Sequence, residues 1–412
     1  MSKLKATAGP RLGEFVALMA LMTSLVAMSI DMMLPALSGI GADLGVQSGN
    51  ANQLVVTMIF LGLAVGQLFY GALSDSVGRK PAIYLGYAVF FSGSLLAIFA
   101  VSFPMLLAGR LLQGLGVAGP RSVTMALIRD RFEGRAMAQV MSFISAVFIL
   151  VPVIAPSLGQ AILLVADWRA IFVVLFGLGV ISLMWFALRQ PETLPAARRA
   201  PLAAGRIGRA LREVLGNHVA LGYTLMAGLI AGAFQGYLSS AQQIFQFQYG
   251  LGTLFPLIFA MNALAIGLAS FVNGRLVMRY GMRTLLRTAL ITMCALSVLF
   301  TGVAWAAGGQ PSLWLFMGFL MPAFFCVGIL FGNMNALAME PLGHIAGVGA
   351  AVVGSVSTLL ATPLGAAVGQ AYNGTVMPLV MGFAVFGLGA LGLMRWAEGA
   401  RAPSPEGSQP AV

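Results

Sequence analysis

Twelve apolar segments, each long enough to cross a lipid bilayer, follow one another along this chain of 412 residues. A helix needs about 20 mostly apolar residues to span the hydrocarbon core of a membrane. Only 8% of the residues are charged, which is too few to cover the surface of a soluble protein of this length. The sequence therefore predicts an all-α integral membrane protein. We expect its helices at residues 14–36, 51–73, 81–101, 104–127, 138–160, 169–188, 218–240, 253–273, 284–305, 312–336, 346–370 and 374–395.

Basic residues gather in alternate connections between these segments. Arg79 and Lys80 follow the second segment, and six arginines lie between the sixth and the seventh, whereas the opposite connections hold only Arg169. Because basic residues favour the cytoplasmic side, we expect both termini in the cytoplasm and the chain in the bacterial inner membrane. The net charge of +11 is thus a signal of topology, and we expect no nucleic acid as a partner.

The segment 189–217 is the one long polar connection, and it divides the chain into two similar parts. We predict a six-helix bundle over 1–188, a cytoplasmic linker over 189–217, a second six-helix bundle over 218–396 and a disordered cytoplasmic tail over 397–412. The sequence GALSDSVGRK after the second segment is echoed by GRLVMRYGMR after the eighth. Such parallel repeats are common in transporters.

Asp31 is the only acidic residue deep inside a membrane-length segment. A carboxylate there costs several kcal/mol unless it is paired, hydrated or protonated, so such residues usually serve ion or substrate pathways. At 1.5 Å of rise per residue, Arg110 in the fourth segment lies at a similar depth. Since arginine does not release its proton, Asp31 is the predicted proton carrier and Arg110 the group that tunes it. A fixed structural role for Asp31, or a clamp by Arg110 on backbone carbonyls, remains the alternative.

Four motifs resemble those of one transporter family. The stretch GALSDSVGRKP at 71–81 resembles the signature loop of the major facilitator superfamily, and LLAGRLLQG at 106–114 its fourth-span motif in proton-coupled members. PVIAPSLG at 152–159 resembles a degenerate antiporter motif, and DMMLP at 31–35 the first-span motif of drug exporters. Together they resemble the Bcr/CflA branch of drug:proton antiporters, which includes bicyclomycin and phenicol exporters.

The resemblance implies two pseudo-symmetric six-helix bundles around a central cavity, with Asp31 and Arg110 as neighbours that couple transport to protons. It implies an antiporter helix whose bend at Pro152, Pro156 and Gly159 seals the cavity, although a packing kink is the alternative. It also implies a conformational latch for the outward-facing state. The latch residues are Gly71, Asp75, Gly78, Arg79 and Lys80.

The latch residues also carry expectations from chemistry. Asp75 is expected to accept from backbone amides at the start of a neighbouring helix, where the helix dipole favours an anion. Arg79 is expected to pair with Glu133 or nearby groups. Arg79 and Lys80 could instead be no more than topology charges.

Neutral polar and polarizable side chains supply the candidate substrate wall, because the second half has no Asp, Glu, Lys or Arg at 214–274 or at 288–339. Such a wall suits loose specificity. The candidates are Met58, Gln113, Phe234, Gln235, Tyr237, Met261, Asn262 and Asn335. Arg121, nearer the cytoplasmic end of the fourth segment, is expected to snorkel or to pair locally.

We therefore expect proton-driven export of small lipophilic neutral or cationic drugs by alternating access. The expected partners are the drug, protons and the lipid bilayer, the expected state is a monomer, and no cofactor or metal is expected besides the coupling proton. Proton-coupled transport of an endogenous small polar metabolite, most simply import, remains the alternative. The chain has no HExxH, GxSxG or P-loop motif, so neither an enzyme nor an ATP-driven pump is expected.

Overall fold

The computed structural model describes residues 10–199 and 204–399, and its regular elements within these ranges are all helical. Twelve helices have 20 or more residues. The first six are α1 (Leu12–Asp31), α3 (Leu54–Val77), α4 (Arg79–Ile98), α5 (Phe103–Arg131), α6 (Gly134–Leu163) and α7 (Arg169–Arg189). The second six are α9 (His218–Leu238), α10 (Phe255–Tyr280), α11 (Met282–Ala306), α12 (Leu313–Met339), α13 (Ala346–Gln370) and α14 (Met377–Gly399).

Shorter elements join these helices. Two are α-helices, α2 (Leu37–Asp43) and α8 (Ala204–Gly216), and Gln243–Gln248 forms a π-helical turn. The 3₁₀ segments are Leu34–Ala36, Ala51–Gln53, Ala196–Arg198, Gly252–Leu254 and Glu340–Ile345.

Ten stretches of the described chain are long and apolar enough to cross a membrane. One of them, Leu313–Gln370, contains both α12 and α13. The remaining long helix is α5, which lies among the others but carries Arg110, Gln113 and Arg121. The prediction of twelve membrane-length helices is therefore confirmed, with end points that move by a few residues.

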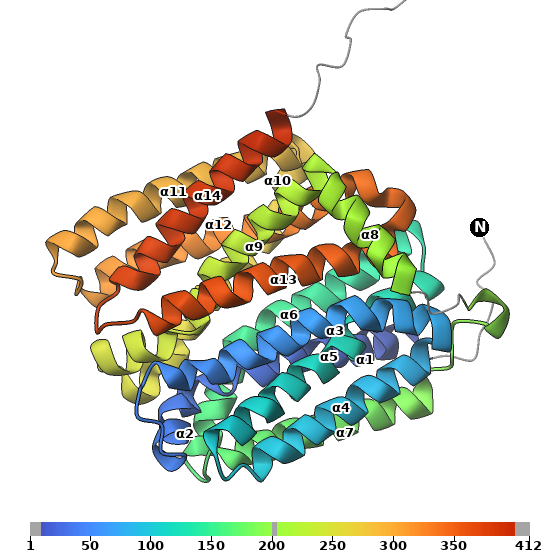
Figure 1. Ribbon diagram of the computed structural model, residues 1–412, viewed down its shortest axis with the longest axis horizontal. Coiled ribbons are helices and arrows are strands. Elements are labelled where there is room, and N and C mark those ends of the chain that lie inside the picture. The colour runs from blue at the N-terminus through green and yellow to red at the C-terminus, as the bar shows by residue number, and fades with distance from the viewer. Residues whose placement is uncertain (1–9, 200–203, 400–412) are drawn as a thin grey trace, which may run out of the picture.

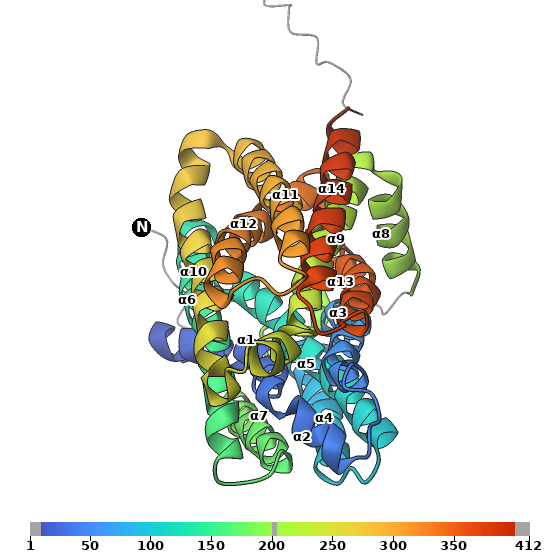
Figure 2. The same cartoon turned by 90° about the vertical axis from the view of Figure 1, so that its left-hand side faces the viewer.

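The helices form two bundles, as Figures 1 and 2 show from perpendicular directions. In the first bundle α5 packs against both α3 and α4, and in the second α9 packs against both α13 and α14. The bundles meet where α3 lies along α13 and α6 along α10. This is the predicted fold class. The exact domain limits stay a prediction, and of the predicted tail at 397–412 only 397–399 are described, as the end of α14.

Small residues set the close approach of α3 and α5. A Cβ atom at Gly114 would overlap the backbone oxygen of Ile59, and one at Gly62 would overlap that of Leu111. Membrane helices associate largely through such packing, because lipid is as apolar as their side chains.

The sequence echo between the two halves has a structural counterpart. Gly78 joins α3 to α4 with φ 110° and ψ 162°, and Gly281 joins α10 to α11 with φ 77° and ψ 156°. This backbone region is almost restricted to glycine. The same tight connection is thus built twice, once in each bundle.

Candidate functional site

A cavity of about 470 Å³ lies between the two bundles and is lined by side chains from both. This volume is within the range of pockets that hold small organic molecules. The first bundle contributes Asp31, Gln67 and Arg121 as its polar lining residues. The polar residues that the second bundle contributes to the described lining are all neutral, and they lie among aromatic and aliphatic ones. The cavity is therefore apolar overall, with charge confined to one wall.

Asp31 is the last residue of α1 and the only acidic residue of the described cavity lining. Its exposed fraction is 4%, and it makes no hydrogen bond or ion pair with any residue of the described ranges. The chain turns directly after it, because Pro35 lies in the 3₁₀ segment that follows α1. Asp31 is thus a nearly buried carboxylate with access to the cavity and no fixed structural partner.

Arg110 is fully buried and clamps backbone carbonyls instead of pairing with Asp31. Its Nε donates to the oxygen of Val55 at 3.1 Å and its Nη2 to that of Ser29 at 2.8 Å. Its Nη1 donates to Gln113 Oε1 at 2.8 Å. Arg110 therefore holds the last turn of α1 through Ser29, two residues before Asp31, and acts on Asp31 only through the backbone.

Gln113 belongs to this network and does not line the cavity. Its Nε2 donates to Ser94 Oγ at 2.9 Å, which ties α5 to α4. Met58 and Met261 are half-buried and also lie outside the cavity lining. These three predicted wall residues are thus not brought to the cavity.

The other five predicted wall residues do line the cavity: Phe234, Gln235, Tyr237, Asn262 and Asn335. The ring of Tyr237 stacks on Phe259 with centroids 5.6 Å apart and meets Phe324 edge-on at 4.7 Å. Asn262 donates to the Tyr237 hydroxyl at 3.2 Å, but its buried Oδ1 has no hydrogen-bond partner among the described residues.

The prolines of α6 bring that helix to the cavity and to the end of α1. Pro152 lines the cavity, and Pro156 lies one turn further on. A Cβ at Gly159 would overlap the backbone oxygen of Met32, the residue after Asp31. The glycine therefore permits α6 to pack closely on the turn that presents the carboxylate.

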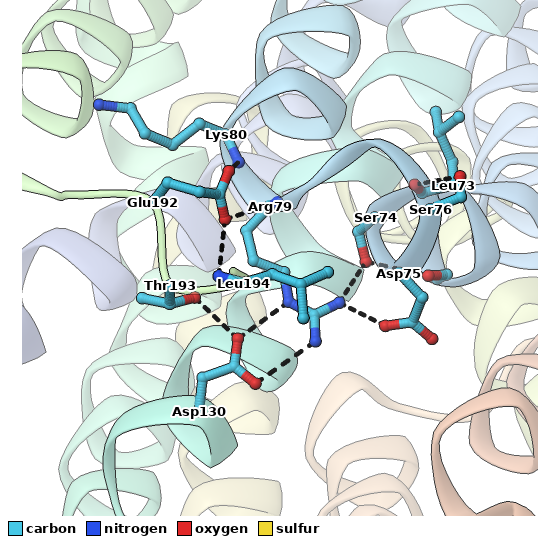
Figure 3. Close-up of polar contacts among 11 residues, drawn as sticks. Leu73, Ser74, Asp75, Ser76, Arg79, Lys80, Asp130, Glu192, Thr193 and Leu194 are labelled. Carbon is cyan, nitrogen blue, oxygen red and sulfur yellow. Dashed lines mark hydrogen bonds and ion pairs between the residues drawn. The ribbon is translucent and has the colours of Figure 1, made fainter. Parts of the chain in front are cut away.

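The latch residues gather around Arg79, which is buried at the end of the molecule where α3 meets α4 (Figure 3). Its guanidinium pairs with Asp75, donates to Asp130 from Nε at 2.9 Å and from Nη2 at 3.3 Å, and reaches Ser74 Oγ at 3.0 Å. Thr193 from the linker donates to the same Asp130 carboxylate at 2.7 Å. Asp130 therefore joins α4, α5 and the linker.

Glu192 occupies the position expected for Asp75. Its carboxylate accepts from the backbone amides of Arg79 at 3.0 Å and Lys80 at 2.9 Å, which begin α4 (Figure 3). The expectation that Asp75 would accept at a helix start was wrong, since Asp75 is held by Arg79 one turn later in the chain. Arg79 pairs with Asp130, one of the groups near Glu133, whereas Glu133 itself is exposed at the start of α6.

Two further latch residues make simple contacts. Lys80 Nζ donates to the oxygen of Ala187 at 3.1 Å, so it is tied to α7 as well as being a topology charge. Gly71 faces the second bundle, where a Cβ would lie 3.6 Å from that of Ala351 on α13. The latch thus joins four helices of the first bundle, α3, α4, α5 and α7, and lies against the second.

Arg121 was not among the predicted wall residues, yet it faces the cavity. It lines the cavity, is half-buried, and makes no hydrogen bond or ion pair within the described ranges. It follows Arg110 by eleven residues, which is three helical turns, so the two arginines lie on the same face of α5. That spacing was the available signal that Arg121 faces inward.

Comparison with known proteins agrees with this architecture. Residues 19–366 match the family model of the Major Facilitator Superfamily. The bicyclomycin resistance protein homolog of Haemophilus influenzae is 32% identical over 375 residues, which cover 89% of this chain and 91% of that protein. The multidrug resistance protein MdtL of Escherichia coli is 30% identical over 331 residues, covering 79% and 80%. The uncharacterized MFS-type transporter YdgK of Bacillus subtilis is 33% identical over 356 residues, covering 85% and 87%.

Solved structures show the same fold. A D-xylose-proton symporter superposes with a TM-score of 0.73 at 13% identity, and the match covers 95% of this chain and all of that one. The human organic anion transporter MFSD10 gives a TM-score of 0.69 at 18% identity, over 94% of this chain and all of that one. These identities speak for the fold alone. From its family match, its relatives and its twelve-helix architecture, the chain belongs to the major facilitator superfamily of membrane transporters, which are not enzymes.

Proposed function

We propose that this transporter exports small lipophilic molecules in exchange for protons and that Asp31 carries the proton. The observation that carries the proposal is the carboxylate of Asp31, which lies in the wall of a cavity of about 470 Å³ and has no partner among the described residues. A carboxylate held in an ion pair would stay charged, whereas one without a partner can lose or gain its proton as the hydration of the cavity changes. The relatives named for bicyclomycin and multidrug resistance support drugs as substrates.

The surroundings of Asp31 support coupling between its proton and movement of the bundles. Arg110 fixes the backbone of α1 at Ser29, and Gly159 seats α6 on Met32. A change of charge on Asp31 therefore acts on a turn that two helices hold in place. Substrate and proton would compete for this cavity, as exchange requires.

We propose that both termini face the cytoplasm and that the transporter works as a monomer by alternating access. At the end remote from the termini, polar contacts join the two bundles. Asn50 Nδ2 donates to the backbone oxygens of Gln370 and Tyr372, both at 2.9 Å, and Gln243 Nε2 donates to Asn50 Oδ1 at 2.6 Å. These bonds would close the outer side while the cavity receives substrate from the inside.

Substitution of Asp31 by asparagine tests the proposal. In proteoliposomes with an imposed pH gradient, Asp31→Asn is expected to abolish gradient-driven transport of a phenicol, because an amide cannot carry the proton. The control is Asp167→Asn, which removes an exposed carboxylate between α6 and α7 and is expected to leave transport unchanged.

The same vesicles establish the direction of transport. Export predicts that substrate moves against the inward flow of protons, and import predicts that both move together. Full gradient-driven transport by Asp31→Asn, or symport of substrate and protons by the unaltered protein, would refute the proposal.

A further inference from the structure

We propose that Arg121 binds an anionic group of the transported compound, so that the cavity accepts aromatic organic anions. The inference rests on the proposed function, because it concerns which compounds the same cavity holds. It extends the substrate range beyond neutral and cationic drugs.

Arg121 has no hydrogen-bond or ion-pair partner within the described part of the protein. In these ranges, hydrogen bonds or ion pairs engage the carboxylates of Glu14, Asp43, Asp75, Asp130, Asp167, Glu192, Glu213, Glu340 and Glu398. Glu133 is exposed at the start of α6. Only Asp31 remains, and it makes no ion pair with Arg121.

Asp31 and Arg121 lie far apart in the cavity. Arg110 marks the level of the end of α1, because it donates to Ser29. Arg121 is eleven residues further along α5, which corresponds to roughly 16 Å of helix rise. The cavity thus has a carboxylate towards one end and a guanidinium towards the other, too far apart for the two to neutralise each other directly.

The surroundings of the Arg121 guanidinium strengthen its attraction for an anion. Apolar residues of the first bundle share the cavity lining with Arg121, among them Val26 on α1 and Phe148 and Ile149 on α6. In such an environment an unpaired guanidinium attracts an anion more strongly than it would in water. Its planar fork of N–H groups fits a carboxylate or sulfonate through two parallel hydrogen bonds.

The opposite wall of the cavity, formed by the second bundle, suits an aromatic ring system. Phe234, Tyr237 and Phe324 from the second bundle line the cavity and contact one another. Rings prefer stacked or edge-on partners at such distances. A flat aromatic compound with one acidic group can therefore reach both walls at once.

Two dyes on the same xanthene ring system form the test: fluorescein, which is anionic, and rhodamine 123, which is cationic. Binding of each to the purified full-length protein in detergent is measured by fluorescence anisotropy at fixed pH. Arg121→Gln is expected to weaken fluorescein binding at least about tenfold, as expected for loss of a charged hydrogen-bonding partner. Rhodamine 123 binding is expected to be unchanged or stronger. Arg121→Lys keeps the charge but loses the fork, so an intermediate effect is expected.

The matched control is Arg135→Gln, which removes an exposed arginine outside the cavity and is expected to leave both affinities unchanged. Retained rhodamine 123 binding by Arg121→Gln shows that this variant is folded. Fluorescein affinity that is the same with and without Arg121, or absence of fluorescein binding by the unaltered protein, would overturn the inference. Both of these fluorescein-binding outcomes are independent of proton exchange. Failure of the pH gradient to drive transport of any dye or phenicol would overturn the proposed function and leave the conclusion about fluorescein binding unaffected.

Discussion

Gly78 gives the sharpest test of how the latch is held, because its counterpart Gly281 supplies a matched control. At Gly78 the backbone has φ 110° and ψ 162°, and alanine in this region costs about 1–3 kcal/mol. A Cβ there would also lie 2.8 Å from Glu192 Oε2, so the carboxylate must leave the amides that begin α4. Loss of such a cap costs roughly another 1 kcal/mol.

Gly281 has the same kind of backbone, with φ 77° and ψ 156°, but no neighbouring atom of the described residues lies within 4 Å of the position that a Cβ would take. Gly281→Ala therefore carries the backbone cost alone. We expect Gly78→Ala to lower the midpoint of thermal unfolding in detergent further than Gly281→Ala does. The difference reports the displaced Glu192 carboxylate.

A double substitution separates the two contributions. In protein that already carries Glu192→Ala, Gly78→Ala is expected to cost only as much as Gly281→Ala, because no carboxylate remains to be displaced. Sites in contact are expected to be non-additive in this way. Equal shifts for the two glycines, or full additivity of Gly78→Ala with Glu192→Ala, would refute the reasoning.

Two further substitutions test the contacts between helices. Asn50→Ala removes three side-chain hydrogen bonds between the bundles at one end, together worth about 1–2 kcal/mol, and should enlarge the population with the bundles apart there roughly tenfold. Distances between spin labels at Ser48 and Asn373 measure this, and an unchanged distribution would contradict it. Gly114→Ala forces a side chain onto the backbone of α3 and should cost about 3 kcal/mol or more of stability, seen as lost folded yield. Gly177→Ala, with open space around its Cβ on α7, should be neutral or slightly stabilising, and similar yields for both would argue against close packing as the cause.

The helices, and the similar level of Asp31 and Arg110, could be predicted because they depend on composition along one segment at a time. The run of apolar residues sets helix length, and helix rise sets depth. Five of the eight predicted wall residues line the cavity. They could be predicted because each bundle has one face towards the cavity.

The partners of charged groups could not be predicted, because they come from distant parts of the chain. Lys80 and Glu192 are 112 residues apart, and Arg79 and Asp130 are 51 apart. Residue type alone does not show which acidic group reaches the start of α4 and which reaches the guanidinium of Arg79. Only the packing of the linker on α4 and α5 decides between them.

Arg110 shows a different limit. Its level beside the end of α1 agrees with the prediction, but level does not reveal direction, and backbone carbonyls compete with a carboxylate for a guanidinium. The carbonyls of Ser29 and Val55 accept the hydrogen bonds of Arg110, because α1, α3 and α5 approach closely enough to surround its side chain.

The uneven distribution of charge around the cavity has a consequence for the evolution of resistance. Every charged residue of the described lining belongs to the first bundle, while the second contributes aromatic, amide and hydroxyl groups. Under the proposed mechanism, substitutions at Phe234 or Asn262 would alter which drugs bind without removing the group that carries the proton. New substrate ranges could therefore arise by stepwise change in the second half of the gene, each intermediate still coupled to the proton gradient.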